Sequence, residues 1–423
     1  MDKELTEKFF DILHEELVPA LGCTEPIAIA LASAKARDVL GCIPEHIVAK
    51  CSGNLIKNVK CVIVPNTDDL IGIEASAIVG AVGGDFSKGM EVLEGVTPEQ
   101  LELAKKLYAN RICDVELLDT PLNLHLIICA EAGQNNVEVE IRNLHDNITS
   151  IRKNGVSVYN AKENDGLYYG VLTDRSILSF DRIYDFITNT PIERLKEVFT
   201  PQIEDNIRIA EEGLTGKYGV GIGTCLIAND KSLAAKMKAY AASASEARMS
   251  GCTLPVITNS GSGNQGIAAS IPVIVYAREK GVPEEKLYRA LALSNLLTIY
   301  QKTFIGRLSA FCGAVSAAAA SGGAITYLAG GTPDQIKMTL INALADVSGI
   351  VCDGAKASCG AKISAALDAA ITGHYLAMDN KFYQPHTGIL QSGIDETISA
   401  VGRMAVEGMR DTDKVILEIM LGK

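Results

Sequence analysis

The spacing of hydrophobic residues along the chain is helical at first, then strand-like, then helical again. Near the N-terminus five apolar residues recur at helical spacing: Leu5, Phe9, Ile12, Leu13 and Leu17. They predict an amphipathic helix over residues 3–17, which Pro19 ends. We expect a second helix with Thr24 as its N-cap, ending at Leu40 before Gly41.

The next part of the chain contains short segments rich in β-branched residues, separated by turn residues. These segments predict strands, and they cover residues 47–51, 60–64, 124–129, 137–142 and 148–153. Thr97 and Gln100 flank Pro98 in the pattern of a capping box, which predicts a helix between the strands.

Helical patterns dominate from about Arg175 onward. The clearest cover residues 230–248, 283–302, 333–344, 361–378 and 395–409. We therefore predict an α+β protein with two domains. Residues 1–170 would form the N-terminal helices and a mixed α+β domain, and residues 171–423 a large all-helical catalytic domain.

The longest apolar stretch, residues 308–331, consists mostly of Ala, Gly and Ser. Such small residues contribute too little transfer energy for a membrane span. The stretch predicts a buried pair of helices, broken at Ser321, Gly322 and Gly323.

Composition excludes some functions. The formal net charge is −12 and no Lys/Arg run is present, which argues against nucleic-acid binding. Residues 1–5 do not begin a basic, then apolar, signal, so we expect no secretory signal and no membrane partner. With 11 cysteines, an odd number, the chain fits a reducing cytoplasm. The oligomeric state stays open, a homo-oligomer included.

Three cysteines of the C-terminal half lie among glycine and alanine residues: Cys312, Cys352 and Cys359. Small neighbours let the backbone close around a bulky group, and thiolates are the usual ligands of iron–sulfur clusters. Three ligands would leave one iron open to substrate. Buried, inert cysteines are the simpler interpretation, and a zinc site is a weaker one because Cys352 and Cys359 are far apart for a short knuckle. Spacing alone does not choose among these interpretations.

Cys23 precedes the expected helix at Thr24, where the helix dipole favours a thiolate. Its pKa could fall toward neutrality there, which would make it a base or a nucleophile. Glu25 works against this, because a neighbouring carboxylate raises a thiol pKa.

Residues 258–266 form a polar, glycine-rich segment before an apolar helix. Backbone N–H groups in such a loop can bind a carboxylate or a phosphate, although a solvent-exposed connection is the more ordinary interpretation. The segment also shares a short likeness with the asparagine loop of pyridoxal-phosphate enzymes, which makes that cofactor the main competitor. The side chains that we expect to hold a substrate carboxylate are Asn259, Ser262, Asn264, Gln265 and Lys302.

Taken together, the order of these segments resembles the L-cysteine desulfidase family, which is similar to the iron–sulfur L-serine dehydratases. The resemblance rests on residues 21–26, 250–252 leading into 261–266, 311–313 and 352–360. It implies a 4Fe–4S cluster with one open iron, held by Cys312, Cys352 and Cys359, and acid–base catalysis by Cys23. Serine dehydratases space their second and third cluster cysteines further apart, which favours the desulfidase branch.

The resemblance implies a carbon–sulfur lyase that eliminates sulfide from L-cysteine to give pyruvate, ammonia and hydrogen sulfide. Three alternatives remain. An L-serine or L-threonine dehydratase would use the same cluster on a hydroxyl leaving group. A pyridoxal-phosphate lyase would need a Schiff-base lysine, and an iron–sulfur sensor or binding protein would show no turnover.

Overall fold

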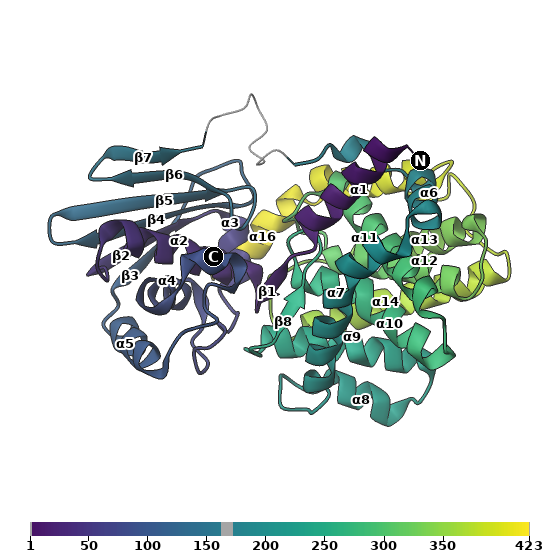
Figure 1. Cartoon of the computed structure of the whole chain (residues 1–423), viewed down its shortest axis with the longest axis horizontal. Helices are drawn as coiled ribbons and strands as arrows, with labels where there is room; N and C mark the ends of the chain where they lie inside the picture. The colour runs from purple at the N-terminus through teal and green to yellow at the C-terminus, as the bar shows by residue number, and fades with distance from the viewer. Residues whose placement is uncertain (1, 162–171, 423) are drawn as a thin grey trace.

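The computed structural model describes residues 2–161 and 172–422, which form a sheet-containing lobe and a helical lobe (Figure 1). This architecture confirms the predicted α+β class. The domain boundary predicted at 170/171 lies outside the described residues.

The sheet lobe is built on six strands in the order β3-β2-β4-β5-β6-β7. The strands are β2 (His46–Cys51), β3 (Cys113–Leu117), β4 (His125–Ala132), β5 (Asn135–Arg142), β6 (Ile148–Lys153) and β7 (Val156–Asn160). Only β2 and β3 run parallel; the other neighbours are antiparallel. Residues alternate between buried and half-exposed along β2, because one face of the sheet carries helices.

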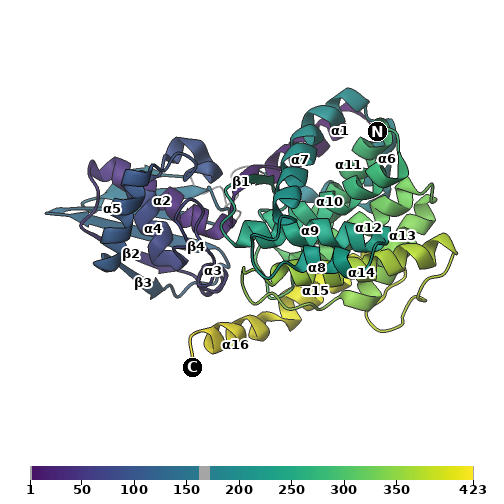
Figure 2. The same ribbon diagram turned by 90° about the horizontal axis from the view of Figure 1, so that it is seen from below.

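Four helices accompany this sheet: α2 (Thr24–Leu40), α3 (Gly53–Val59), α4 (Gly72–Gly83) and α5 (Pro98–Ala109), with the short 3-10 helix η1 (Phe86–Glu91). Helix α2 packs on β4 and β5, and α5 packs on α4 (Figure 2). Thr97 and Gln100 form the predicted capping box, and Gly41 ends α2 in the left-handed conformation. Four of the five predicted strands are confirmed.

The strand predicted over residues 60–64 is wrong. Lys60 donates its backbone N–H to Ile56 and so continues the last turn of α3. Ile63 forms only an isolated bridge with Ile71, although Val62 and Val64 are fully buried. Their β-branched pattern reflects burial in a bend and not strand pairing. Helices α3 and α4 and strands β3 and β7 were not expected.

The helical lobe contains η2 (Arg175–Ile177), α6 (Phe180–Asn189), α7 (Ile192–Gly213), α8 (Ile222–Asn229), α9 (Leu233–Met249), α10 (Gly263–Lys280), α11 (Glu284–Ile305), α12 (Gly313–Leu328), α13 (Pro333–Val347), α14 (Cys359–Met378), α15 (Ile394–Arg403), the π-helix η3 (Met404–Gly408) and α16 (Arg410–Met420). Alanine-rich faces of α9, α10, α12 and α14 pack closely together in its core. The lobe is not wholly helical, since it also holds the short strand β8 (Pro255–Ile257).

The break predicted at Ser321–Gly323 does not occur, and α12 is one continuous helix. A Cβ atom on Gly322 would lie 3.0 Å from the backbone oxygen of Ala370 in α14. Glycine is therefore used here for close packing between two helices, which outweighs its low helix propensity.

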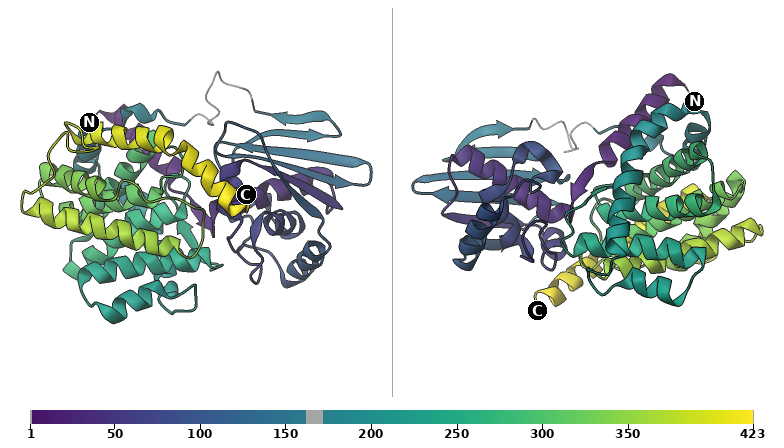
Figure 3. Two further views of the ribbon diagram at one scale, coloured as in Figure 1. Left: turned by 180° about the vertical axis from the view of Figure 1, so that it is seen from behind. Right: turned by 60° about the horizontal axis from the view of Figure 1, so that its bottom comes forward.

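The two ends of the chain cross between the lobes. Helix α1 (Lys3–Glu16) packs on the helical lobe, where Phe9 stacks on Phe186. Strand β1 (Pro19–Leu21) then pairs with β8. At the other end α16 reaches back to α3 in the sheet lobe (Figure 3), where Lys57 Nζ lies 2.5 Å from Asp413 Oδ1. In the described part of the chain, no helix combines the length and apolar character that membrane crossing requires.

Candidate active site

A cavity of about 90 Å³ lies where the start of α2 meets the helical lobe. Its wall includes all four cysteines that the sequence analysis singled out: Cys23, Cys312, Cys352 and Cys359. Lys302 of α11 and Arg248 of α9 also line it. Residues more than 300 positions apart in the sequence thus share one small space.

Two short backbone segments bring Cys312 and Cys352 together. Phe311 bridges Val351, and the N–H of Cys312 donates to the carbonyl of Ile350 at 3.0 Å. The N–H of Cys352 donates in turn to the carbonyl of Ala310 at 2.7 Å. Cys312 is the N-cap of α12, and Cys359 is the first residue of α14. Two helix N-termini therefore meet near these sulfur atoms, which favours negative charge there.

The three sulfurs affect one another electrostatically. Burial raises the pKa of Cys312 to about 12, and the neighbouring Cys352 and Cys359 contribute to that rise. Burial likewise raises the pKa of Cys359. Three thiolates in one buried site need a compensating positive charge. A metal centre provides that charge, and the thiols that coordinate it lose their protons. The donor set therefore suits a thiolate-bound metal group.

Within the ranges 2–161 and 172–422, no three His, Cys, Asp or Glu side chains are grouped closely enough to hold a metal ion. A cubane iron–sulfur cluster does not require its ligands to converge on one metal ion, because its cysteine ligands bind different iron atoms. The three thiols line one cavity, and two of them lie at helix N-termini, which fits that arrangement.

Lys302 is a buried cation of the cavity wall that interacts electrostatically with Cys352 and Cys312. Burial lowers its pKa to about 8, while the sulfurs of Cys352 and Cys312 oppose that shift. Lys356 and Lys362, which are also close in sequence, do not line the cavity; both pair with Asp353.

Cys23 reaches the cavity through the pairing of β1 with β8, which ends beside the glycine-rich loop. Thr24 Oγ1 donates to the carbonyl of Gly261 at 3.0 Å and fixes this junction. Cys23, and not Thr24, is the N-cap of α2, and its side chain makes no capping hydrogen bond.

The expected fall in the Cys23 pKa is wrong. Burial raises this pKa well above the usual value, the charge of Glu25 raises it further, and Arg248 only partly opposes them. The thiol donates to Glu25 Oε2 at 2.9 Å. The neighbouring carboxylate and the loss of solvent therefore outweigh the helix dipole.

Glu25 is buried and held from two sides. Asn58 Nδ2 donates to Glu25 Oε1 at 2.9 Å, and His145 Nε2 lies 3.9 Å from the same oxygen. Burial alone would raise the pKa of Glu25, but His145 and the Cys23 thiol outweigh it and lower the pKa to about 2. Glu25 is consequently a carboxylate that accepts the hydrogen bond of the Cys23 thiol.

The glycine-rich loop divides into two parts. Ser262, Asn264 and Gln265 line the cavity at the start of α10. Asn259 is not among the lining residues: it is fully buried, and its amide donates to Asn295 Oδ1 at 2.9 Å. Asn259 therefore anchors the loop to α11.

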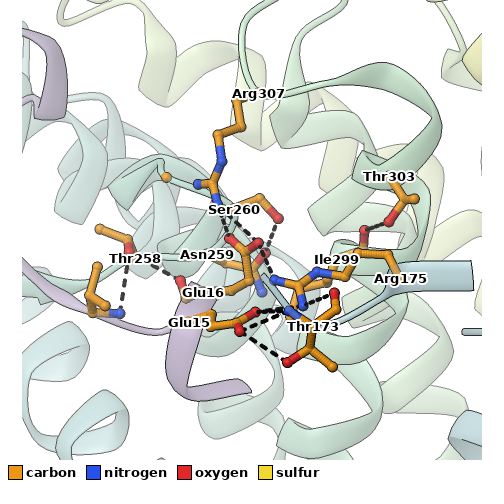
Figure 4. A network of polar contacts seen from close by, with 12 residues as sticks. Glu15, Glu16, Thr173, Arg175, Thr258, Asn259, Ser260, Ile299, Thr303 and Arg307 are labelled. Atoms are coloured by element: carbon orange, nitrogen blue, oxygen red, sulfur yellow. Dashed lines mark hydrogen bonds and ion pairs between the residues drawn. The ribbon is translucent and has the colours of Figure 1, made fainter. Parts of the chain in front are cut away.

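Arg307 lines the cavity and belongs to an ion-pair network at its edge (Figure 4). Its Nη2 lies 2.9 and 2.8 Å from the two carboxylate oxygens of Glu16. Arg175 Nη2 donates to Glu16 at 2.9 Å, and its Nη1 lies 2.6 Å from Glu15 Oε2. The network ties α1 to the segment between α11 and α12.

Sequence reasoning missed Arg248. It lies in the last turn of α9, within a run of alanine and serine residues that is buried on all sides. A charged residue inside such a run is a usable signal, because small residues on every face of a helix predict burial and burial of a charge requires a reason.

Comparison with known proteins identifies the class. A family model described as serine dehydratase alpha chain matches residues 87–418. The chain belongs to this family of serine dehydratase-like lyases, which typically depend on an iron–sulfur cluster.

The chain is also similar over its whole length to several bacterial proteins. It is 47% identical to a UPF0597 protein of Treponema denticola, over 100% of this chain and 99% of the relative. It is 50% identical to a UPF0597 protein of Lachnoclostridium phytofermentans, over 98% of this chain and 99% of the relative. These names state no substrate.

Proposed function

We propose that this chain is an iron–sulfur-dependent lyase that eliminates the β-substituent of a small L-amino acid, with L-cysteine as the substrate. Pyruvate, ammonia and hydrogen sulfide would be the products. The observation that carries the proposal is the convergence of Cys312, Cys352, Cys359 and Cys23 on one cavity. Family membership supports the lyase class.

Cys312, Cys352 and Cys359 are the residues that would hold a 4Fe–4S cluster. A cluster with one iron free of cysteine would supply a Lewis acid for the leaving group of the substrate. Lys302 would offset part of the negative charge of the thiolates, which burial makes costly.

Cys23 is the residue that we assign to removal of the Cα proton. Because it is held as a thiol, it must lose its own proton first. Glu25 is the acceptor within hydrogen-bond distance, at 2.9 Å, and its pKa must rise from about 2 for it to take that proton. We therefore assign Glu25 as the partner of Cys23. Asn58 and His145 would hold the carboxylate in place through this transfer.

The start of α10 would hold the substrate. Ser262, Asn264 and Gln265 line the cavity close to the N–H groups that begin this helix, which favours an anionic group. The enamine that remains after elimination then tautomerises to an imine, which hydrolyses to pyruvate and ammonia.

L-Serine is the second candidate substrate, and the name of the matching family favours it. Thiolate leaves carbon more readily than hydroxide, so one site could act on either amino acid with cysteine needing less assistance. L-Threonine would require room for one more methyl group in a cavity of about 90 Å³.

The test is turnover by anaerobically prepared holoprotein, with pyruvate measured for both amino acids and sulfide for L-cysteine. We expect equal amounts of sulfide and pyruvate from L-cysteine and a higher kcat/KM than for L-serine. Preference for L-serine would move the assignment to a dehydratase. No turnover of either, by protein with a full cluster, would contradict the lyase assignment and favour a sensor. Inactivation by borohydride in the presence of pyridoxal phosphate would instead indicate a Schiff-base lysine.

A further inference from the structure

Arg248 is a buried cation in the cavity wall. Arg248 is 2% exposed and lies in the last turn of α9. Nη1 donates to Asn264 Oδ1 at 3.1 Å, whereas Nε is buried without any hydrogen-bond partner. Within the described parts of the chain, no Asp or Glu oxygen forms an ion pair with this guanidinium.

This isolation distinguishes Arg248 from the other arginine of the cavity. Arg307 is neutralised by both carboxylate oxygens of Glu16. An arginine cannot lose its proton to escape the cost of burial, as a lysine can. A guanidinium without a counter-ion in a buried cavity is therefore complementary to an anion that enters from outside.

The surroundings of Arg248 hold it in one orientation. Asn264 Oδ1 accepts from Nη1 of Arg248 and also from Ser245 Oγ, the latter at 3.0 Å. Gly263 leaves room for the guanidinium, because a Cβ atom there would collide with Nε and lie 2.6 Å from Cζ. Among the described residues one hydrogen bond of this guanidinium is found, from Nη1 to Asn264, so N–H donors remain for an anion, and the planar guanidinium group suits a carboxylate.

The same wall offers an acceptor for a positively charged group. Gln265 Oε1 is buried and has no hydrogen-bond donor among the described residues, and Gln265 follows Asn264 directly at the start of α10. The Gln265 carboxamide packs over Gly313, next to Cys312. A guanidinium and a carboxamide oxygen in one cavity match the two charged ends of a free α-amino acid.

We propose that Arg248 binds the α-carboxylate of the substrate and so restricts the site to amino acids with a free carboxylate, while Gln265 accepts a hydrogen bond from the α-ammonium group. This inference rests on the proposed function and narrows its substrate class. It assigns carboxylate recognition to Arg248 and leaves Lys302 to balance the cysteine thiolates.

The test uses probes that lack a leaving group, so that binding is separate from turnover. L-Alanine carries both charged groups, L-alaninamide lacks the carboxylate charge, and ethylamine lacks the group altogether. Each would be measured by calorimetry on the holoprotein, and as an inhibitor of L-cysteine turnover. Wild type should bind L-alanine roughly 100-fold more tightly than L-alaninamide. Equal binding of the two would overturn the proposal without any variant.

The variant Arg248→Gln should weaken L-alanine binding by roughly 100-fold and leave L-alaninamide binding unchanged. Arg248→Lys keeps the charge but not the bidentate geometry, so it should give an intermediate loss. Arg289→Gln is the matched control: it removes a partly buried arginine that pairs with Glu285 away from the cavity, and it should bind L-alanine as wild type does.

Two outcomes distinguish this inference from the proposed function. Normal turnover with unchanged L-alanine binding in Arg248→Gln would overturn the role of Arg248 alone. The same conclusion would follow if Lys302→Gln, and not Arg248→Gln, lost the preference for L-alanine over L-alaninamide. Arg248-dependent binding of L-alanine in a holoprotein that turns over neither L-cysteine nor L-serine would uphold the carboxylate site and contradict the lyase assignment.

Discussion

The chemistry assigned to Cys23 depends on its immediate neighbours more than on its helix. A helix N-terminus lowers a thiol pKa by attraction, yet Cys23 is 3% exposed and lies 2.9 Å from the Glu25 carboxylate. Burial and a like charge both favour the neutral thiol. Removal of the Cα proton by Cys23 therefore requires a partner that first takes the proton of the thiol. This requirement makes Glu25 as important as Cys23.

Cys23→Ala and Glu25→Gln should each lower kcat for L-cysteine by about 100-fold or more, the usual contribution of a positioned acid or base. Both variants should retain the iron content of wild type, because neither residue is a proposed cluster ligand. The exposed Cys61 provides the matched control Cys61→Ala, which should have normal kcat. Full activity in Glu25→Gln would show that the Cys23 proton does not pass through Glu25.

A histidine far from the reacting groups should make stability depend on pH. Burial lowers the pKa of His374 to about 4 from an ordinary 6.5. The unfolded chain therefore takes up this proton first as pH falls, so the stabilisation present above pH 6.5 is lost progressively toward pH 4. The loss amounts to about 3 kcal/mol.

Urea unfolding between pH 4 and pH 8 checks this prediction. His374→Gln should lack that part of the decline, since glutamine can still bond Thr326, which lies 2.9 Å from His374 Nδ1. Parallel decline in both proteins would assign the pH dependence to other groups.

At the scale of elements, the site is made of junctions: β1 into α2, β8 into α10, and two bridged segments before α12 and α14. The loop at 261–266 in one of these junctions was predictable from sequence because it has a local signature. The same holds for Thr97 and Gly41, which cap helices α5 and α2 in the sheet lobe. The bend at residues 60–64 could not be predicted from sequence, because its β-branched residues are selected by burial against distant parts of the fold. Residues 321–323 were misread for the same reason.

Gly266→Ala tests the junction before α10. Alanine favours a helix by about 1 kcal/mol over glycine, but a Cβ atom at this position would collide with the backbone carbonyl of Ile257 and lie 2.9 Å from the carbonyl carbon of Thr258. Overpacking against backbone costs about 1–3 kcal/mol, so net destabilisation is expected. KM should rise as well, because Gln265 adjoins the displaced residue.

Thermal unfolding and KM would be compared with those of Gly95→Ala. A Cβ atom added to Gly95 would meet no other atom within 4 Å, and the residue has an ordinary negative φ, so that variant should be neutral. Stabilisation in Gly266→Ala would show that the junction yields without strain.

At the scale of the whole molecule, the chain ends hold the two lobes against each other. Helix α16 packs on α3, and Lys57 has a side chain only 1% exposed that pairs with Asp413. Gly354, between two of the proposed cluster ligands, lies directly against the backbone oxygen of Lys57. The C-terminal helix thus supports the loop that carries Cys352. No sequence pattern indicates the pairing of Lys57 with Asp413, because the two residues are more than 350 positions apart.

Asp413→Ala should lower the free energy of unfolding by about 3–5 kcal/mol, because it leaves the Lys57 charge buried without a partner. Denaturant unfolding measures the effect. Asp411→Ala, which removes a carboxylate that is 89% exposed in the first turn of α16, should change stability by less than about 0.5 kcal/mol. Equal effects of the two substitutions would contradict the role of the buried pair.

The convergence of distant cysteines is the part of the site that sequence motifs anticipated, whereas Arg248 and the Glu25 contacts emerge only from the packing of α9 and α2 around the cavity. The most direct test is therefore the iron and acid-labile sulfide content of anaerobically purified protein, measured alongside L-cysteine turnover. We predict about four iron and four sulfide per chain in wild type, with loss of both cluster and activity in Cys312→Ser, Cys352→Ser and Cys359→Ser, and neither loss in Cys61→Ser. Turnover that persists in protein without iron would contradict the account.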